Sequence, residues 1–176
     1  MPSDVFPDAD APRLRDFLCF AVYSANLAFG RAYQPILEAL GLTSYTQLIA
    51  IVALGEEDNQ SVRSLGEKLF LESNTLTPIL KKLESVGYVR RRRDPADERQ
   101  VIVSLTPEGR RVRERARDMS LTEAAGVGAD LPEVQTAVVK VRDNLLRHVA
   151  DEKAGLAAAR ANAPGESGQP RTPSTV

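Results

Sequence analysis

The sequence predicts a mainly α-helical fold with one small β-hairpin. Two short segments with helical spacing, residues 61–70 and 73–87, are joined by a tight turn, as in a helix-turn-helix. A basic segment with the pattern of a hairpin follows directly. Helical patterns near both ends carry apolar stripes that a lobe of this size cannot cover alone. Together these features predict a winged helix-turn-helix whose terminal helices form an intertwined helical dimer.

The first helical pattern spans residues 12–40, and we expect it to bend before Pro35. A second helix is expected over residues 44–54. Its continuous apolar run could also be a buried strand, but the short linkers on both sides favour a helix. In the helix at 73–87 the apolar residues share one face, and Gly87 is placed to end it.

The predicted hairpin has strands at residues 88–93 and 100–105 and a tip at 94–98. Thr106 then has the residue type of a helix N-cap and is followed by a proline, which suits the first position of a helix. The last helix is expected from about residue 132 to residue 161, with valine and leucine along one stripe.

A single domain of about residues 12–160 is expected from the chain length of 176 residues. Residues 1–11 and 161–176 lack periodicity, and we expect them to be mobile tails. The domain would divide into two dimerisation regions and a central DNA-binding lobe, at about residues 12–41, 107–160 and 44–105.

Composition excludes several classes of protein. With one cysteine, Cys19, and one histidine, His148, the chain has neither an internal disulfide nor a cluster of typical metal ligands. The longest apolar stretches are too short to span a bilayer, and the N-terminus lacks the pattern of a signal peptide. We therefore expect a cytoplasmic protein that uses no metal and no cofactor.

The charge distribution points to a polyanionic partner. The net charge is only −1, but residues 81–117 hold twelve Lys and Arg against six Asp and Glu, while the rest of the chain holds eleven against eighteen. Basic charge concentrated in one segment is what binding to the phosphates of double-stranded DNA requires.

The second helix of the helix-turn-helix is expected to enter the major groove. Its exposed hydroxyl and amide groups could reach base edges, and two lysines one turn later could neutralise phosphates. These candidates are Ser73, Asn74, Thr75, Thr77, Lys81 and Lys82. An ordinary amphipathic helix with a solvated face would show the same pattern, so this segment alone does not decide the matter.

A run of four arginines lies in the first strand of the hairpin: Arg90, Arg91, Arg92 and Arg93. Such a run by itself is more often a solvated segment, but its place in a wing favours DNA contact. Arg99 near the tip is expected to reach the minor groove. Asp97, two residues earlier, is expected to hold the Arg99 guanidinium.

From about Leu14 to Arg117 the sequence resembles the MarR family of winged helix-turn-helix repressors. The match is specific in LESNTLTPILKKLESVGYVRRRRDPADERQVIVSLTPEGR, including the Asp-x-Arg element at residues 97–99. The stretch LCFAVYSANLAFGRAY resembles the branch of organic hydroperoxide sensors, in which a lone reactive cysteine lies near the start of the first helix. The resemblance implies that Cys19 is oxidised to a sulfenic acid and then capped by a small thiol.

The same resemblance implies tyrosines that act across the dimer. Tyr23 lies one turn from Cys19, whereas Tyr33 is fourteen residues on, roughly 21 Å along a straight helix, and could reach only a partner's sulfur. Phenolic hydroxyls that donate to the sulfur would favour the reactive thiolate. Tyr45 is the candidate for the second of these tyrosines. Where the branch has Thr-Tyr-Pro-Gln, this chain has Thr-Ser-Tyr-Thr, so the sequence leaves open whether Tyr45 occupies the same position.

Three functions are compatible with these patterns. The leading hypothesis is a homodimeric repressor that leaves its operator when an organic hydroperoxide oxidises Cys19. The alternative within the same class is a regulator that responds to a small aromatic ligand, in which case Cys19 would be an inert packing residue. A thiol peroxidase is the alternative from another class, but no second cysteine is present to resolve a sulfenic acid, so we expect no enzyme.

Overall fold

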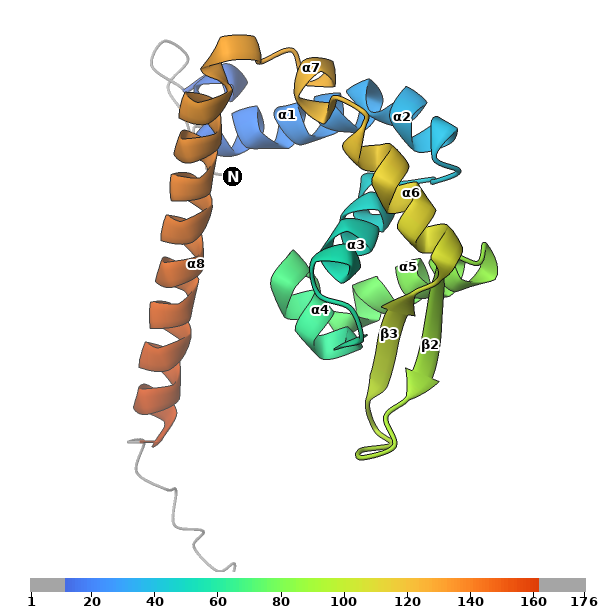
Figure 1. The fold of residues 1–176 in the computed structure, drawn as a ribbon. Helices are drawn as coiled ribbons and strands as arrows, with labels where there is room; N and C mark the ends of the chain where they lie inside the picture. The colour runs from blue at the N-terminus through green and yellow to red at the C-terminus, as the bar shows by residue number, and fades with distance from the viewer. Residues whose placement is uncertain (1–11, 162–176) are drawn as a thin grey trace, which may run out of the picture. The chain divides into compact units, whose positions relative to one another are not determined.

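Residues 12–161 are described by the computed structural model, with side chains described through residue 156. They divide after Gly126 into two units, which are considered separately (Figure 1). The first unit contains a 3₁₀ turn, Leu14–Asp16, then α1 Leu18–Ala32, α2 Gln34–Ala39, α3 Tyr45–Glu56, β1 Gln60–Ser61, α4 Val62–Leu69, α5 Ser73–Ser85, β2 Val89–Arg93, β3 Val101–Leu105, α6 Pro107–Arg117 and α7 Leu121–Ala124. The second contains a 3₁₀ turn, Gly128–Asp130, and α8 Leu131–Ala161. The predicted fold class is confirmed.

The core of the first unit is built around α3, so the apolar run that could have been a strand is a helix. Leu48, Ile51 and Leu54 on this helix are fully buried. Apolar side chains of α4, α5, β3 and α6 surround them: Leu65, Leu76, Leu80, Leu83, Val103 and Val112. Because each of these helices turns one apolar face inward, its polar face is left for solvent or a partner.

The sheet has three antiparallel strands in the order β1-β3-β2. The predicted hairpin is confirmed, with Val89 paired to Leu105 and Arg93 to Val101. The short strand β1 was not predicted, because two residues give no periodic signal and its pairing with β3 spans some forty residues of sequence.

Hydroxyl side chains begin three helices of the lobe. Ser44 accepts a hydrogen bond from the Gln47 N–H at 3.3 Å. Ser61 accepts from the Ser64 N–H at the start of α4. The predicted cap of α6 is confirmed, since the Thr106 hydroxyl accepts from the Gly109 N–H at 3.0 Å and a proline follows it.

The predicted bend before Pro35 is confirmed, but the first helical region is not one helix from residue 12. It is a 3₁₀ turn followed by two helices that meet at Tyr33. Pro35 lies in the first turn of α2, where its missing N–H removes one hydrogen bond to the preceding turn. Several apolar side chains of this region are exposed in the single chain: Leu14, Phe17, Leu18, Val22 and Leu27.

In the second unit, the predicted last helix is present as α8, which has 31 residues. Apolar side chains are exposed along it: Val134, Val138, Leu145, Leu146 and Val149. The predicted tails fall at residues 1–11 and 162–176, outside the described residues, while residue 161 is still helical. In the part of the chain that the structure describes, no helix has both the length and the hydropathy needed to cross a membrane.

Candidate nucleic-acid interface and cysteine site

The first two turns of α5 present polar groups outward. Ser73, Asn74 and Thr75 are exposed, and Thr77 is half-buried. The Thr75 hydroxyl donates to Asn74 Oδ1 at 3.2 Å, which leaves the Asn74 amide nitrogen as an outward donor. The Thr77 hydroxyl donates to the Ser73 carbonyl at 2.6 Å, so its hydrogen is used within α5 and not for an outside partner.

A groove of about 420 Å³ lies between the wing and the helix-turn-helix. It brings together four of the predicted DNA-contacting residues: Ser73, Thr77, Asp97 and Arg99. It also includes Ser61 and Arg63 from the start of α4, which the sequence reasoning missed because nothing in their local pattern indicates that α4 begins opposite the wing. Lys81 and Lys82 lie outside this groove, exposed on a later turn of α5.

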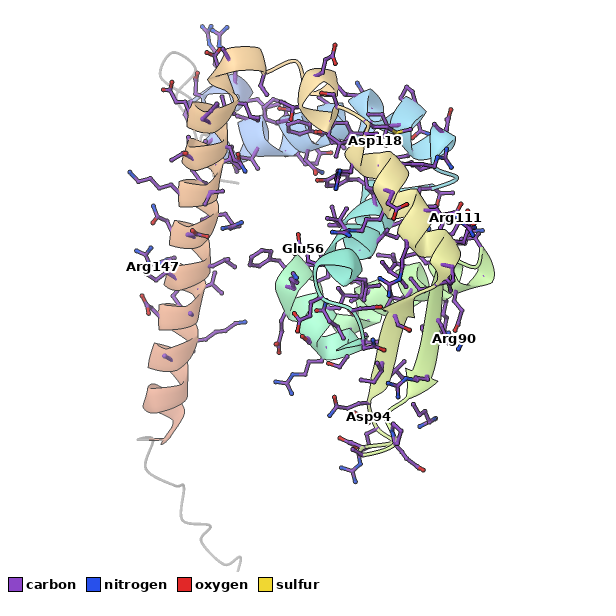
Figure 2. The ribbon with its side chains drawn as sticks, in the orientation of Figure 1. Glu56, Arg90, Asp94, Arg111, Asp118 and Arg147 are labelled. Carbon is purple, nitrogen blue, oxygen red and sulfur yellow. The ribbon has the colours of Figure 1, made fainter. Side chains whose placement is uncertain are left out.

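The four arginines of β2 do not act alike. Residues alternate between the faces of a strand, so Arg90 and Arg92 lie on one face and Arg91 and Arg93 on the other. Arg91 is half-buried and its guanidinium donates to Glu84 at 2.6 and 2.8 Å. Arg93 donates to the Glu98 carbonyl at 2.7 Å and so steadies the tip. Arg90 and Arg92 remain exposed; Arg90 lies near the base of the wing and Asp94 near its tip (Figure 2).

Asp97 does not hold the Arg99 guanidinium as predicted. Its Oδ1 accepts from the main-chain N–H of Arg99 at 3.1 Å, and its Oδ2 accepts from the side chain of Gln100 at 3.1 Å. The carboxylate therefore stabilises the turn at the tip of the wing. Aspartate often does this by accepting a hydrogen bond from the main-chain N–H two residues later. The exposed Arg99 side chain is presented by this turn.

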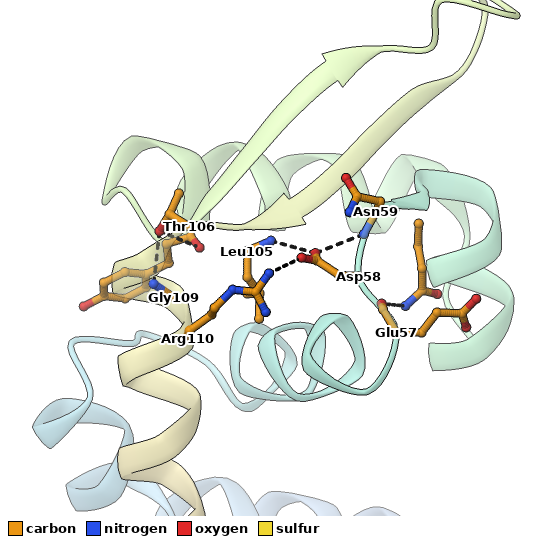
Figure 3. Close-up of polar contacts among 9 residues, drawn as sticks. Glu57, Asp58, Asn59, Leu105, Thr106, Gly109 and Arg110 are labelled. Carbon is orange, nitrogen blue, oxygen red and sulfur yellow. Dashed lines mark hydrogen bonds and ion pairs between the residues drawn. The ribbon is translucent and has the colours of Figure 1, made fainter.

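The base of the wing is fixed by Asp58, in the turn between α3 and β1 (Figure 3). Its Oδ1 accepts from the Leu105 N–H at the end of β3, at 3.0 Å, and its Oδ2 pairs with Arg110 of α6. Asp58 thus ties the turn that follows α3 to the wing and to α6. Sequence reasoning missed it because its partners are about fifty residues away along the chain.

The predicted redox residues fall in two places within one chain. Cys19 is exposed in the first turn of α1, with Tyr23, also exposed, one turn away. Tyr33, at the junction of α1 and α2, is buried and its ring centroid lies 5.4 Å from that of Tyr45. Tyr45, the first residue of α3, meets Tyr33 directly, so the departure from the branch motif does not separate these two tyrosines within the chain.

The tyrosine pair lines a pocket of about 430 Å³ together with Asn26, Phe29 and Thr46. Burial raises the pKa of the Tyr33 hydroxyl above its ordinary value of 10.0, and neighbouring Tyr45 adds to the rise. Tyr33 therefore stays protonated at neutral pH and is a hydrogen-bond donor. Among the described residues, no group of three or more His, Cys, Asp or Glu is arranged to hold a metal ion.

Comparison with known proteins agrees with this geometry. Residues 31–115 match the family described as transcriptional regulator SarA/Rot. The chain is 46% identical over 124 residues to the HTH-type transcriptional regulator TtmR of Methylorubrum extorquens, a match that covers 70% of this chain and 63% of TtmR, less than two thirds of that relative. It is 35% identical over 139 residues to the organic hydroperoxide resistance transcriptional regulator of Bacillus subtilis, covering 77% of this chain and 94% of that protein.

Solved structures of AbfR, from Staphylococcus epidermidis, are similar in fold and sequence. Reduced AbfR bound to DNA superposes with a TM-score of 0.65 at 34% identity, covering 78% of this chain and 96% of AbfR. Overoxidised AbfR bound to DNA gives 0.60 at 34% identity, covering 76% and 95%. These relatives are transcriptional regulators rather than enzymes. The chain belongs to the MarR family of winged helix-turn-helix transcriptional regulators, in the branch of the organic hydroperoxide regulators.

Proposed function

We propose that this regulator is a homodimeric repressor released from its operator when an organic hydroperoxide oxidises Cys19. The observation that carries the proposal is the exposure of the chain's only cysteine in the first turn of α1. An exposed thiol at that position is open to a peroxide, and the thiolate is the form that attacks it.

The reaction would proceed in two steps. The Cys19 thiolate attacks the terminal peroxide oxygen and the O–O bond breaks, so the sulfur becomes a sulfenic acid. The alkoxide that leaves takes one proton from water to become the alcohol. A small thiol then attacks the sulfenic sulfur, water leaves, and a mixed disulfide remains. The second step adds far more volume than one oxygen. In the proposed dimer, where α1 would pack against the partner, the helices could accommodate such a group only by moving.

The behaviour of AbfR supports the second step as the one that releases DNA. The overoxidised form of that protein has been solved while bound to DNA. An overoxidised state is therefore compatible with DNA binding in that relative, which is 34% identical to this chain. To lower operator occupancy from 99% to 1%, oxidation must disfavour the bound state by about 5.5 kcal/mol, which a bulky adduct supplies more readily than an oxygen atom.

The dimer is proposed from exposed apolar surface. Within each unit, α1 and α8 expose apolar side chains that a soluble monomer would bury. In a dimer, the protonated Tyr33 and its neighbour Tyr45 could serve the cysteine of the second subunit, since Tyr33 lies fourteen residues along the chain from its own Cys19. Sedimentation at micromolar concentration should give twice the mass of the chain, and a monomer that binds the operator would contradict the assembly.

The proposal is tested with operator binding of the wild type and of Cys19→Ser, a variant without any cysteine. The variant should bind as well as the reduced wild type and ignore cumene hydroperoxide with or without free cysteine. The wild type should be released fully only when both reagents are present. Release of Cys19→Ser by the peroxide would refute the redox proposal.

A second candidate function is favoured by the pocket beside Phe29, Tyr33 and Tyr45, which is large enough for a small aromatic molecule. In that case Cys19→Ser would respond to the inducer as the wild type does. A phenolic compound that releases both proteins equally would therefore support this alternative.

A further inference from the structure

The carboxyl-terminal end of α2 is held by two side chains from distant parts of the lobe. Helices end with carbonyls that have no partner within the helix. Here the Leu40 carbonyl accepts from the Tyr88 hydroxyl at 3.1 Å, and the Ala39 carbonyl accepts from the Arg115 guanidinium. Tyr88 immediately precedes β2, whereas Arg115 belongs to α6. One of the two contacts therefore joins α2 to the base of the wing.

The main chain of Tyr88 is fixed on both sides. Its N–H donates to the Leu83 carbonyl of α5 at 2.9 Å, and its carbonyl accepts from the Thr106 N–H at 3.1 Å. A β-carbon at Gly109 would collide with the same carbonyl, so α6 packs directly against it. The next residue, Val89, is buried and begins β2. A displacement of Tyr88 would therefore displace the first strand of the wing.

The hydroxyl end of the Tyr88 side chain is also closely packed, against Gly41. Gly41 has a φ of +69°, and a β-carbon built there would lie 2.6 Å from the Tyr88 hydroxyl oxygen. The phenol ring is rigid and two side-chain torsions join it to the backbone, so a push on its hydroxyl must move the ring, the backbone or both. Tyr88 thus connects the end of α2 to the start of β2 through a single side chain.

We propose that Tyr88 is a positioning residue that couples the placement of α2 to the placement of the wing on DNA. The proposal rests on the proposed function, because α2 directly follows the helix that carries Cys19 and begins next to Tyr33. When α1 and α2 shift after oxidation, the hydroxyl contact transmits the shift to β2 and to the exposed Arg90, Arg92 and Arg99.

A double-mutant cycle tests this coupling without any oxidation. The four proteins are the wild type, Gly41→Ala, Tyr88→Phe and the double variant, all reduced. Gly41→Ala should weaken operator binding by about tenfold when Tyr88 is present and by less than about threefold in the Tyr88→Phe background, where the hydroxyl is gone. The backbone strain at a positive φ acts in both backgrounds and cancels in the cycle.

Hydrogen exchange of the wing amides, residues 89–105, gives a second readout that needs no operator. Exchange should rise in Gly41→Ala and return toward the wild-type rate in the double variant. Arg115→Gln removes the other contact to α2 without touching the wing and is the matched control, so its wing amides should exchange as in the wild type. Thermal unfolding of every variant separates loss of coupling from loss of folding.

Equal effects of Gly41→Ala in both backgrounds, on affinity and on exchange, would overturn the role of Tyr88. No effect in either background would overturn it as well. Failure of the redox proposal would look different: the wild-type operator complex would survive treatment with cumene hydroperoxide and cysteine, while the cycle would still decide whether Tyr88 positions the wing.

Discussion

Glu84, in the last turn of α5, accepts three hydrogen bonds from Arg91 of β2: two from the guanidinium and one from the main-chain N–H. The pair joins the helix that presents Asn74 and Thr75 to the strand that carries the wing arginines. This carboxylate therefore helps to hold the recognition helix against the first strand of the wing.

Glu84→Gln should weaken operator binding by about three- to tenfold. A neutral amide cannot accept all three hydrogen bonds from Arg91, so the wing would be held less firmly against α5. Folding should change little, since the pair is partly exposed. Fluorescence anisotropy with labelled operator measures the effect. Glu108→Gln breaks the comparable pair with Arg111 at the start of α6 and is the control; an equal loss in both variants would mean that only net charge matters.

The same pair predicts a pH dependence. Hydrogen bonds from Arg91 hold the pKa of Glu84 below its ordinary value of 4.5. A carboxylate whose pKa is lowered by folding contributes stability that is present above its unfolded pKa and is lost as the pH falls through its folded pKa. The difference in thermal unfolding midpoint between the wild type and Glu84→Gln should thus be constant from pH 7 to about 5 and shrink at more acid pH. A difference that grows on acidification would contradict the assignment.

Arg99→Ala should weaken operator binding and lower the slope of log affinity against log salt by about 1, because one fewer cation displaces counterions from DNA. Arg147→Ala is the matched control, because it removes the same charge from an exposed position on α8, outside the wing. Titrations at several salt concentrations decide the point. An unchanged slope for Arg99→Ala would remove the tip of the wing from the interface.

Asn74→Ala should alter sequence preference rather than general affinity. Its amide nitrogen faces outward, and loss of one base contact costs about 1–3 kcal/mol of discrimination. Competition between the operator and single-base variants measures this. Lys82→Ala, which removes a charge two turns later, should instead weaken all sequences alike; the same result for Asn74→Ala would place another element in the groove.

The sequence predicts those features that depend on local spacing. Residue type and periodicity predict where two helices begin, at Ser44 and Thr106, and they predict the two strands of the hairpin and the buried face of α5. The strand β1 and the contacts of Asp58 could not be predicted, because they depend on residues far apart in the chain that meet only in the folded lobe.

The sequence alone also could not predict the different roles of the side chains within a run of similar residues. Four adjacent arginines are equivalent in the sequence. In the structure, the strand points them alternately to its two faces, and Arg91 donates hydrogen bonds to Glu84. Tyr45 is a similar case, since its departure from the branch motif left its position open in the sequence, and the start of α3 places it against Tyr33.

The central claim is that the adduct on Cys19, and not oxygen alone, releases the operator. The most direct measurement follows operator occupancy and the intact mass of the wild type in the same samples as cumene hydroperoxide is added, first alone and then with free cysteine. Occupancy should stay high while the mass rises by one oxygen and should fall in proportion to the mass of the mixed disulfide. Full occupancy with every Cys19 in the mixed disulfide, or release that precedes any change in mass, would contradict the account.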